Sequence, residues 1–134
     1  MSIIVDASVA LAWCLPDEPN PLAEKALDRL AGEDGLIPAL FWYEVRNVLL
    51  TAERRGRIEA AHADEALSWL REMPFTADPG DDDVRVLALA RKHGLTAYDA
   101  AYLALALAKQ APLATLDAAL AHAAGKEGVA VVGG

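Results

Sequence analysis

The opening run Ser2-Ile3-Ile4-Val5 constrains the fold of this chain more than any other stretch, because a β-branched run of this kind is typical of a buried strand. Helical patterns separate it from further segments of similar character, residues 35–38, 75–77, 113–116 and 129–132. Strands that alternate with helices favour a parallel sheet covered on both faces. The sequence therefore predicts an α/β fold with three layers, α/β/α, around a central parallel sheet of about five strands.

The helical patterns also indicate which helix is buried. They cover residues 7–14, 40–55, 58–73, 96–110 and 118–124, and further helices begin at Pro21 and in the acidic run 81–83. Asn20 is suited to cap the helix that starts at Pro21. Residues 100–108 are apolar on every side, which indicates a helix inside the protein. The acidic run 81–83 is tempting as a metal site, but helix capping explains it better.

Length and cysteine content bound the class of protein. The 134 residues can bury a core as one domain, which we expect to span residues 1–134. Cys14 is the only cysteine, which excludes an internal disulfide and fits a reducing cytoplasm. No charged start followed by an apolar segment indicates export, and the longest apolar stretch, residues 100–108, is too short to span a bilayer. The scattered histidines and single cysteine do not predict a structural zinc site.

The formal net charge of −8 argues against a simple nucleic-acid-binding protein, since such proteins are usually basic. An acidic chain can still act on nucleic acid if metal ions bridge its carboxylates to phosphate, or if its cations cluster. Four arginines lie within twelve residues: Arg46, Arg54, Arg55 and Arg57. For the last three, a solvated face at the end of a helix is an equally good interpretation.

Four carboxylates occupy positions that a parallel sheet brings toward one edge. Asp6 directly follows the first strand, and Asp117 follows the segment 113–116. Ligands in such folds lie beyond the carboxyl ends of the strands. Asp99 opens the buried helix, and Glu44 lies in the first two turns of the helix over 40–55, with Asn47 three residues further on the same face.

Each carboxylate also has an ordinary structural explanation. Asp117 can cap the helix that it precedes, and Thr96-x-x-Asp99 matches a capping box in which Asp99 accepts backbone N–H groups. Glu44 suits the positive end of a helix dipole. These explanations do not exclude a metal site, because a capping carboxylate keeps lone pairs for a cation.

Taken together, the four carboxylates predict a metal centre. Acidic groups within reach of one another repel, and a hard divalent cation relieves that repulsion. Oxygen ligands select Mg²⁺ or Mn²⁺ over zinc. Such an ion polarises a phosphodiester and lowers the pKa of its bound water, which gives hydrolysis without a protein nucleophile. The hydroxyl groups of Ser8 and Thr115 are candidates to orient water or phosphate around it.

Four blocks of the chain resemble the PIN domain and, within it, the VapC-type ribonuclease toxins of prokaryotic toxin–antitoxin pairs. They are residues 4–8 with Asp6, residues 41–49 with Glu44 and Asn47, residues 95–106 with Asp99, and residues 112–120 with Asp117. No single block is specific, but their order and spacing are similar to those of the family through nearly the whole chain.

The resemblance implies a PIN-like fold and Mg²⁺- or Mn²⁺-dependent endonucleolytic cleavage of RNA, with inhibition by a VapB-type antitoxin and assembly as a homodimer. It implies that Asp6, Glu44 and Asp99 hold the principal ion, and that Asp117 ligates a second ion or acts through water. Arg46 is a candidate contact for the RNA backbone. An Arg or Lys from the antitoxin would suit the same acidic crevice.

Competing functions make different predictions. A haloacid-dehalogenase-type phosphatase needs a second acid two residues after the first, where this chain has Ser8. A receiver domain needs an acidic pair, a mid-chain phosphorylated Asp and a late Lys, none of which is in place. Two alternatives stay open: an acidic module that only binds a basic partner, and a PIN nuclease that is not a toxin.

Overall fold

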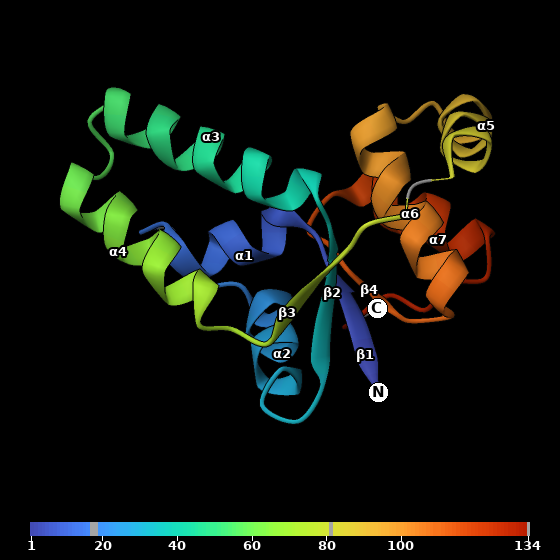
Figure 1. Cartoon of the computed structure of the whole chain (residues 1–134), viewed down its shortest axis with the longest axis horizontal. Coiled ribbons are helices and arrows are strands. Elements are labelled where there is room, and N and C mark those ends of the chain that lie inside the picture. The colour runs from blue at the N-terminus through green and yellow to red at the C-terminus, as the bar shows by residue number, and fades with distance from the viewer. Residues whose placement is uncertain (17–18, 81, 134) are drawn as a thin grey trace.

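A single parallel sheet organises the molecule. The computed structural model describes residues 1–16, 19–80 and 82–133. Within these ranges the sheet has four strands in the order β3-β2-β1-β4, all parallel to their neighbours. The strands are β1 (Ser2–Val5), β2 (Asp34–Pro38), β3 (Phe75–Asp78) and β4 (Leu113–Ala114). Their carboxyl ends point to the top of Figure 1.

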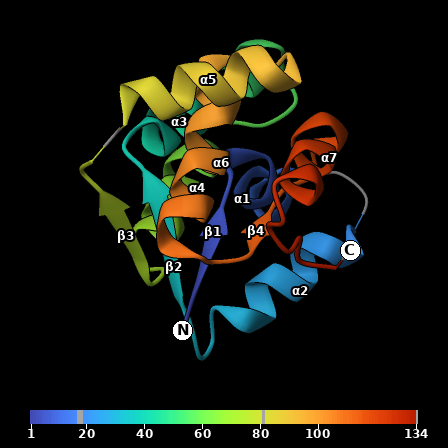
Figure 2. The ribbon, with the colours of Figure 1, turned by 90° about the vertical axis from the view of Figure 1, so that its right-hand side faces the viewer.

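Helices cover both faces of the sheet, which confirms the predicted three-layer α/β/α architecture (Figures 1 and 2). One side carries α1 (Ala7–Cys14), α2 (Pro21–Arg29), α3 (Leu40–Arg54) and α4 (Ala60–Arg71). The other carries α5 (Asp83–His93), α6 (Ala97–Lys109) and α7 (Ala118–Lys126). None of the helices in the described ranges combines the length and the apolar character needed to cross a membrane.

The core lies where β1 meets α6. Ile3, Ile4 and Val5 are fully buried, as a strand covered on both faces requires. Helix α6 contacts β1 and β2, and every residue over 100–106 is buried. The prediction of a buried helix from its all-round apolar pattern is therefore confirmed.

The sheet is one strand smaller than expected, because the segment 129–132 makes only an isolated bridge, Leu113 to Val131. The strand expected over 113–116 also ends early. The backbone N–H of Leu116 donates to the Ser8 hydroxyl at 3.0 Å, and that of Asp117 donates to the Thr115 hydroxyl at 3.0 Å. These bonds take backbone amides that a longer β4 would have used, so the strand ends at Ala114.

Local capping explains several helix boundaries. The Asn20 side chain accepts hydrogen bonds from the backbone N–H groups of Leu22 and Ala23, at 3.0 and 3.1 Å. Asp82 caps α5, and Gly94 ends it in the left-handed conformation with φ of 64°. The predicted capping role of the acidic run is therefore confirmed for Asp82, whereas Asp81 lies outside the described residues.

Candidate active site

The order of the strands reverses at β1, and the carboxyl end of this strand is the position of the acidic crevice that the sequence predicts. The chain adds β2 and β3 on one side of β1 and then returns to place β4 on the other side. Val5 pairs with Ala114, and the Asp6 N–H donates to the Ala114 carbonyl at 3.1 Å. This reversal point is where α/β sheets bind ligands. Asp6 and Thr115 therefore meet where β1 and β4 end.

Asp6 is buried, with 4% of its surface exposed, and both of its carboxylate oxygens accept hydrogen bonds. Oδ1 accepts hydrogen bonds from the Ser8 hydroxyl at 2.5 Å and from the Val9 N–H at 3.2 Å, so Asp6 is the N-cap of α1. Oδ2 accepts one from the Thr115 hydroxyl. Burial raises the pKa of Asp6, these hydrogen bonds oppose the rise, and repulsion from Asp99 adds to it.

Ser8 and Thr115 both contact the Asp6 carboxylate through their hydroxyl groups, which donate to it. Their expected role in orienting water or phosphate stays a prediction. Both hydroxyl oxygens also accept a backbone N–H of the loop after β4. The two hydroxyl groups therefore hold the Asp6 carboxylate and the loop in a fixed relation.

Glu44 projects from α3 toward α6 and is half-buried. Its Oε1 accepts a hydrogen bond from the Tyr102 hydroxyl at 2.7 Å. Burial raises the pKa of Glu44, the Tyr102 hydrogen bond lowers it, and the negative charges of Asp99 and Asp6 raise it further. Asn47, one turn along α3, is exposed.

Arg46 lies on the same helix but turns back onto it. Its Nε donates to the Trp42 carbonyl at 3.1 Å, and its guanidinium carbon lies 4.8 Å from the centroid of the Tyr43 ring. Arg46, Arg54, Arg55 and Arg57 are all exposed. The structure therefore places these arginines on the surface of α3 and the turn after it.

The other two predicted carboxylates, Asp99 and Asp117, lie at the N-termini of α6 and α7. Thr96 caps α6 by accepting the Asp99 N–H at 3.1 Å. The return bond of a capping box, from the Thr96 N–H to the Asp99 carboxylate, is not formed among the described residues, so the predicted box is only half present. Burial raises the pKa of Asp99, and repulsion from Asp117 raises it further. Asp117 caps α7 through the Leu120 N–H at 2.9 Å, which confirms its predicted capping role.

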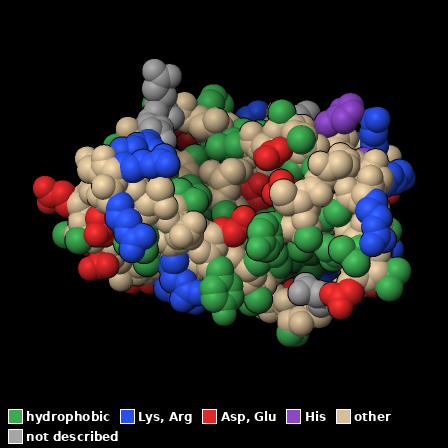
Figure 3. Space-filling model, turned by 90° about the horizontal axis from the view of Figure 1, so that it is seen from above, with side chains coloured by type: hydrophobic (Ala, Val, Ile, Leu, Met, Phe, Trp, Pro, Cys, Tyr) green, Lys and Arg blue, Asp and Glu red, His purple; other side chains and the backbone are tan. Residues whose placement is uncertain are grey.

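The four carboxylates share one electrostatic neighbourhood. Asp99 interacts repulsively with Asp6, Glu44 and Asp117, and Glu44 does so with Asp6. Figure 3 shows acidic side chains gathered near the middle of this face and basic ones toward its two ends. In the part of the chain that the structure describes, no Lys, Arg or His forms an ion pair with any of the four.

This donor set fits a hard divalent cation. All of its oxygens come from carboxylates, which Mg²⁺ and Mn²⁺ prefer. Burial first, and then repulsion from neighbouring carboxylates, raise the pKa values of Asp6, Glu44 and Asp99, and a cation offsets both effects. No three His, Cys, Asp or Glu side chains among the described residues are close enough to enclose an ion directly. The carboxylates thus line the crevice without forming a closed ligand shell.

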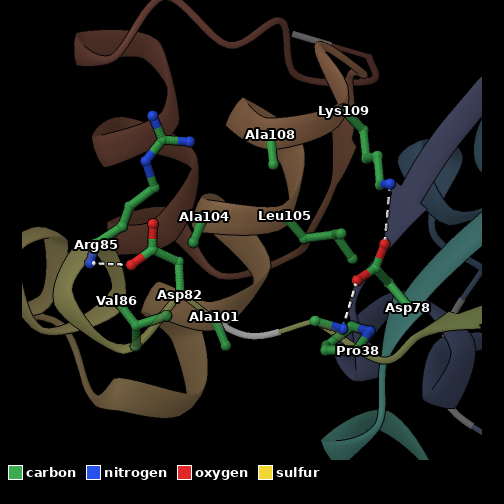
Figure 4. A pocket seen from close by; sticks show the side chains of 11 residues that line it. Pro38, Asp78, Asp82, Arg85, Val86, Ala101, Ala104, Leu105, Ala108 and Lys109 are labelled. Atoms are coloured by element: carbon green, nitrogen blue, oxygen red, sulfur yellow. Dashed lines mark hydrogen bonds and ion pairs between the residues drawn. The ribbon is translucent and has the colours of Figure 1, made fainter.

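A second cavity, of about 240 Å³, lies beside the ends of β2 and β3 (Figure 4). None of the four carboxylates lines it. Its Asp78 is already neutralised: Lys109 pairs with Asp78 at 3.1 Å, and the Gly80 N–H donates to the same carboxylate at 2.9 Å. These contacts lower the pKa of Asp78, the Gly80 hydrogen bond most strongly. We therefore do not assign this cavity to the acidic site.

Sequence reasoning did not include Tyr102 among the site residues. Its hydroxyl reaches Glu44 across 58 positions of the chain. Burial, and then the charge of Glu44, raise the pKa of Tyr102 far above its usual range, so the phenol stays protonated. A signal was present, since a tyrosine in an otherwise Ala- and Leu-rich buried helix needs a partner for its hydroxyl.

A family model, sequence relatives and solved structures all relate this chain to the same family. Residues 3–126 match the family described as PIN domain. The chain is 40% identical over 126 residues to Ribonuclease VapC3 of Pyrobaculum aerophilum, covering 91% of this chain and 94% of that one. It is 34% identical over 120 residues to Ribonuclease VapC9 of Mycobacterium tuberculosis, covering 86% and 85%. The crystal structure of PAE2754 from Pyrobaculum aerophilum superposes with a TM-score of 0.68 at 28% identity, covering 92% and 84%. The chain belongs to the PIN-domain family.

Proposed function

We propose that this protein is a metal-dependent endoribonuclease that hydrolyses RNA phosphodiester bonds and acts as the toxin of a toxin–antitoxin pair. The observation that carries the proposal is the group of four carboxylates at the reversal point of the sheet, in which Asp99 repels each of the other three and no cation pairs with any of them among the described residues. The relatives reported above are named ribonucleases, which supports the reaction class.

The carboxylates have distinct roles in this proposal. Asp6, Glu44 and Asp99 would hold the principal Mg²⁺ or Mn²⁺, and Asp117 would ligate a second ion or act through water. The bound ion supplies polarisation of the phosphodiester and a water of lowered pKa. Ser8 and Thr115 keep the Asp6 carboxylate oriented, since both hydroxyl groups donate to it. On α3, Asn47 is proposed as a supporting residue of the site and Arg46 as a contact for the RNA backbone.

The proposal extends to partners and location. The whole chain, residues 1–134, acts as a single PIN domain. A VapB-type antitoxin blocks the acidic crevice with an Arg or Lys that pairs with its carboxylates. A structure with the same fold is titled as a toxin–antitoxin complex from Klebsiella pneumoniae, with a TM-score of 0.59 at 20% identity. We further propose a homodimer, on family resemblance, and a cytoplasmic location, on the lone Cys14.

The first test is cleavage of labelled, structured RNA by the purified protein in Mg²⁺, in Mn²⁺ and in EDTA. We expect cleavage with either metal and none in EDTA. Asp99→Asn is expected to lose at least a hundredfold in rate while staying folded, because it removes a proposed ligand charge without changing the shape of the side chain. Asp64→Asn is the matched control, since Asp64 is exposed on α4, and it should cleave normally.

Cleavage in EDTA, or full activity of Asp99→Asn, would contradict the proposal. No cleavage and no metal binding by the folded wild-type protein would favour an acidic module that only binds a basic partner. Growth arrest on expression separates a toxin from a PIN nuclease of another kind, and loss of that arrest in Asp99→Asn ties it to the site.

A further inference from the structure

The contact between Tyr102 and Glu44 joins two helices at the acidic site. The Tyr102 hydroxyl donates to Glu44 Oε1 at 2.7 Å, from α6 to α3. Tyr102 is only 1% exposed, whereas Glu44 is half-buried. The contact therefore joins a donor inside the fold to a carboxylate at its edge.

The hydroxyl group is not needed for packing. Tyr102 is the only residue with a polar side chain over residues 100–106, and phenylalanine has the same ring. A buried hydroxyl without a partner is costly, so its presence at this position calls for an acceptor. The acceptor here is a carboxylate of the acidic site rather than a backbone carbonyl of the core.

The same helix carries a second carboxylate of the site. Asp99 lies three residues before Tyr102 on α6, within one turn. The hydrogen bond from Tyr102 therefore ties Glu44, on α3, to the element that bears Asp99. It also occupies Oε1 of Glu44 and leaves Oε2 without a hydrogen bond among the described residues.

We propose that Tyr102 is a positioning residue that presents Glu44 to the metal through Oε2 and fixes its spacing from Asp99. This inference rests on the proposed metal-dependent function. Mutation of a residue that hydrogen-bonds to a metal ligand and orients it typically lowers metal affinity or activity by about ten- to a hundredfold. Without the hydroxyl, Glu44 is free to rotate about its side-chain bonds, and both of its oxygens compete for the ion.

The test compares Tyr102→Phe with Tyr98→Phe, each of which loses one oxygen atom. Tyr98 lies one turn earlier on α6, is 65% exposed, and its hydroxyl has no hydrogen-bond partner among the described residues. Titration calorimetry of the metal-free proteins with Mn²⁺ gives the binding constants without any assay of activity. We expect Tyr102→Phe to bind Mn²⁺ about tenfold more weakly than wild type, and Tyr98→Phe to bind as wild type does.

RNA cleavage as a function of Mn²⁺ concentration provides the second measurement. A positioning role predicts that Tyr102→Phe needs about tenfold more Mn²⁺ for half-maximal cleavage and regains most of its rate at saturating metal. Unchanged Mn²⁺ affinity in Tyr102→Phe would overturn the inference. So would a Tyr102→Phe protein that is unfolded without metal, since the hydroxyl would then serve the fold rather than the site. If wild type itself binds no Mn²⁺, the proposed metal-dependent function is contradicted. If wild type binds Mn²⁺ and Tyr102→Phe binds it equally well, only the positioning role of Tyr102 is contradicted.

Discussion

At the scale of single residues, the Asp6 carboxylate is held by two hydroxyl groups, and one of them offers a clean test. Thr115 is 2% exposed and donates to Asp6 Oδ2. Thr115→Val keeps the shape of the side chain but removes the donor, which leaves a buried carboxylate with one partner fewer. We expect a loss of about 1–3 kcal/mol in the free energy of unfolding and at least a tenfold loss of cleavage rate. Chemical denaturation and the RNA assay measure the two effects.

Thr115→Ser is the control for that change, because it keeps the hydroxyl and removes only a methyl group. It should retain most of the cleavage rate. If Thr115→Val and Thr115→Ser are equally active, the hydroxyl does not orient Asp6 for the reaction. The same pair also tests whether the loop after β4 depends on the bond from the Asp117 N–H to the Thr115 hydroxyl.

At the scale of elements, the start of α2 depends on one side chain. Asn20 accepts the N–H groups of Leu22 and Ala23, and no other side chain caps this helix in the described part of the chain. Asn20→Ala should lower the free energy of unfolding by about 1 kcal/mol and leave RNA cleavage unchanged, because α2 carries none of the four carboxylates. Asn20→Asp keeps a capping oxygen and should stay near wild-type stability. A loss of activity in a folded Asn20→Ala protein would contradict this separation of roles.

At the scale of the whole molecule, the acidic site makes stability depend on pH. The pKa values of Asp6, Glu44 and Asp99 are raised in the folded protein, first of all by burial. Above about pH 4, the ordinary pKa of these groups, the folded state therefore holds protons that the unfolded state has released. Stability consequently falls as pH rises through the raised pKa values. Without metal, we expect the melting temperature to rise when pH is lowered from 7 toward 5.

Metal should reverse this trend, because the ion replaces the protons. At pH 7, Mn²⁺ at a hundred times its dissociation constant should stabilise the protein by about 2.7 kcal/mol, and by less toward pH 5 as protons compete for the carboxylates. Asp99→Asn should show both a shallower pH profile without metal and a smaller response to Mn²⁺. Thermal unfolding with EDTA and with Mn²⁺ across this range measures all of these effects. A metal-free profile that rises steadily from pH 5 to 7 would contradict the prediction.

Much of the fold was predictable because it is encoded in local patterns. The β-branched run at residues 2–5, the all-round apolar helix and the caps at Asn20 and Asp117 are short-range features, and each appears as expected. The sequence also predicted that Asp6 and Asp117, which follow strands, lie at one edge of the sheet, since parallel strands end at the same edge. Their role as metal ligands stays a prediction.

The sequence by itself determined the class of fold and the order of its helices, and it predicted which carboxylates gather beyond the end of β1, because periodicity and position along the chain carry that information. Only the tertiary structure decided which groups hold those carboxylates. The contacts of Thr115 with Asp6 and of Tyr102 with Glu44 span 109 and 58 positions of the chain, beyond any local pattern. It also decided the length of β4, since Ser8 and Thr115 take backbone amides that would otherwise have extended this strand. Hydrogen bonds between distant segments depend on how the layers pack, and that packing exists only once the whole chain has folded.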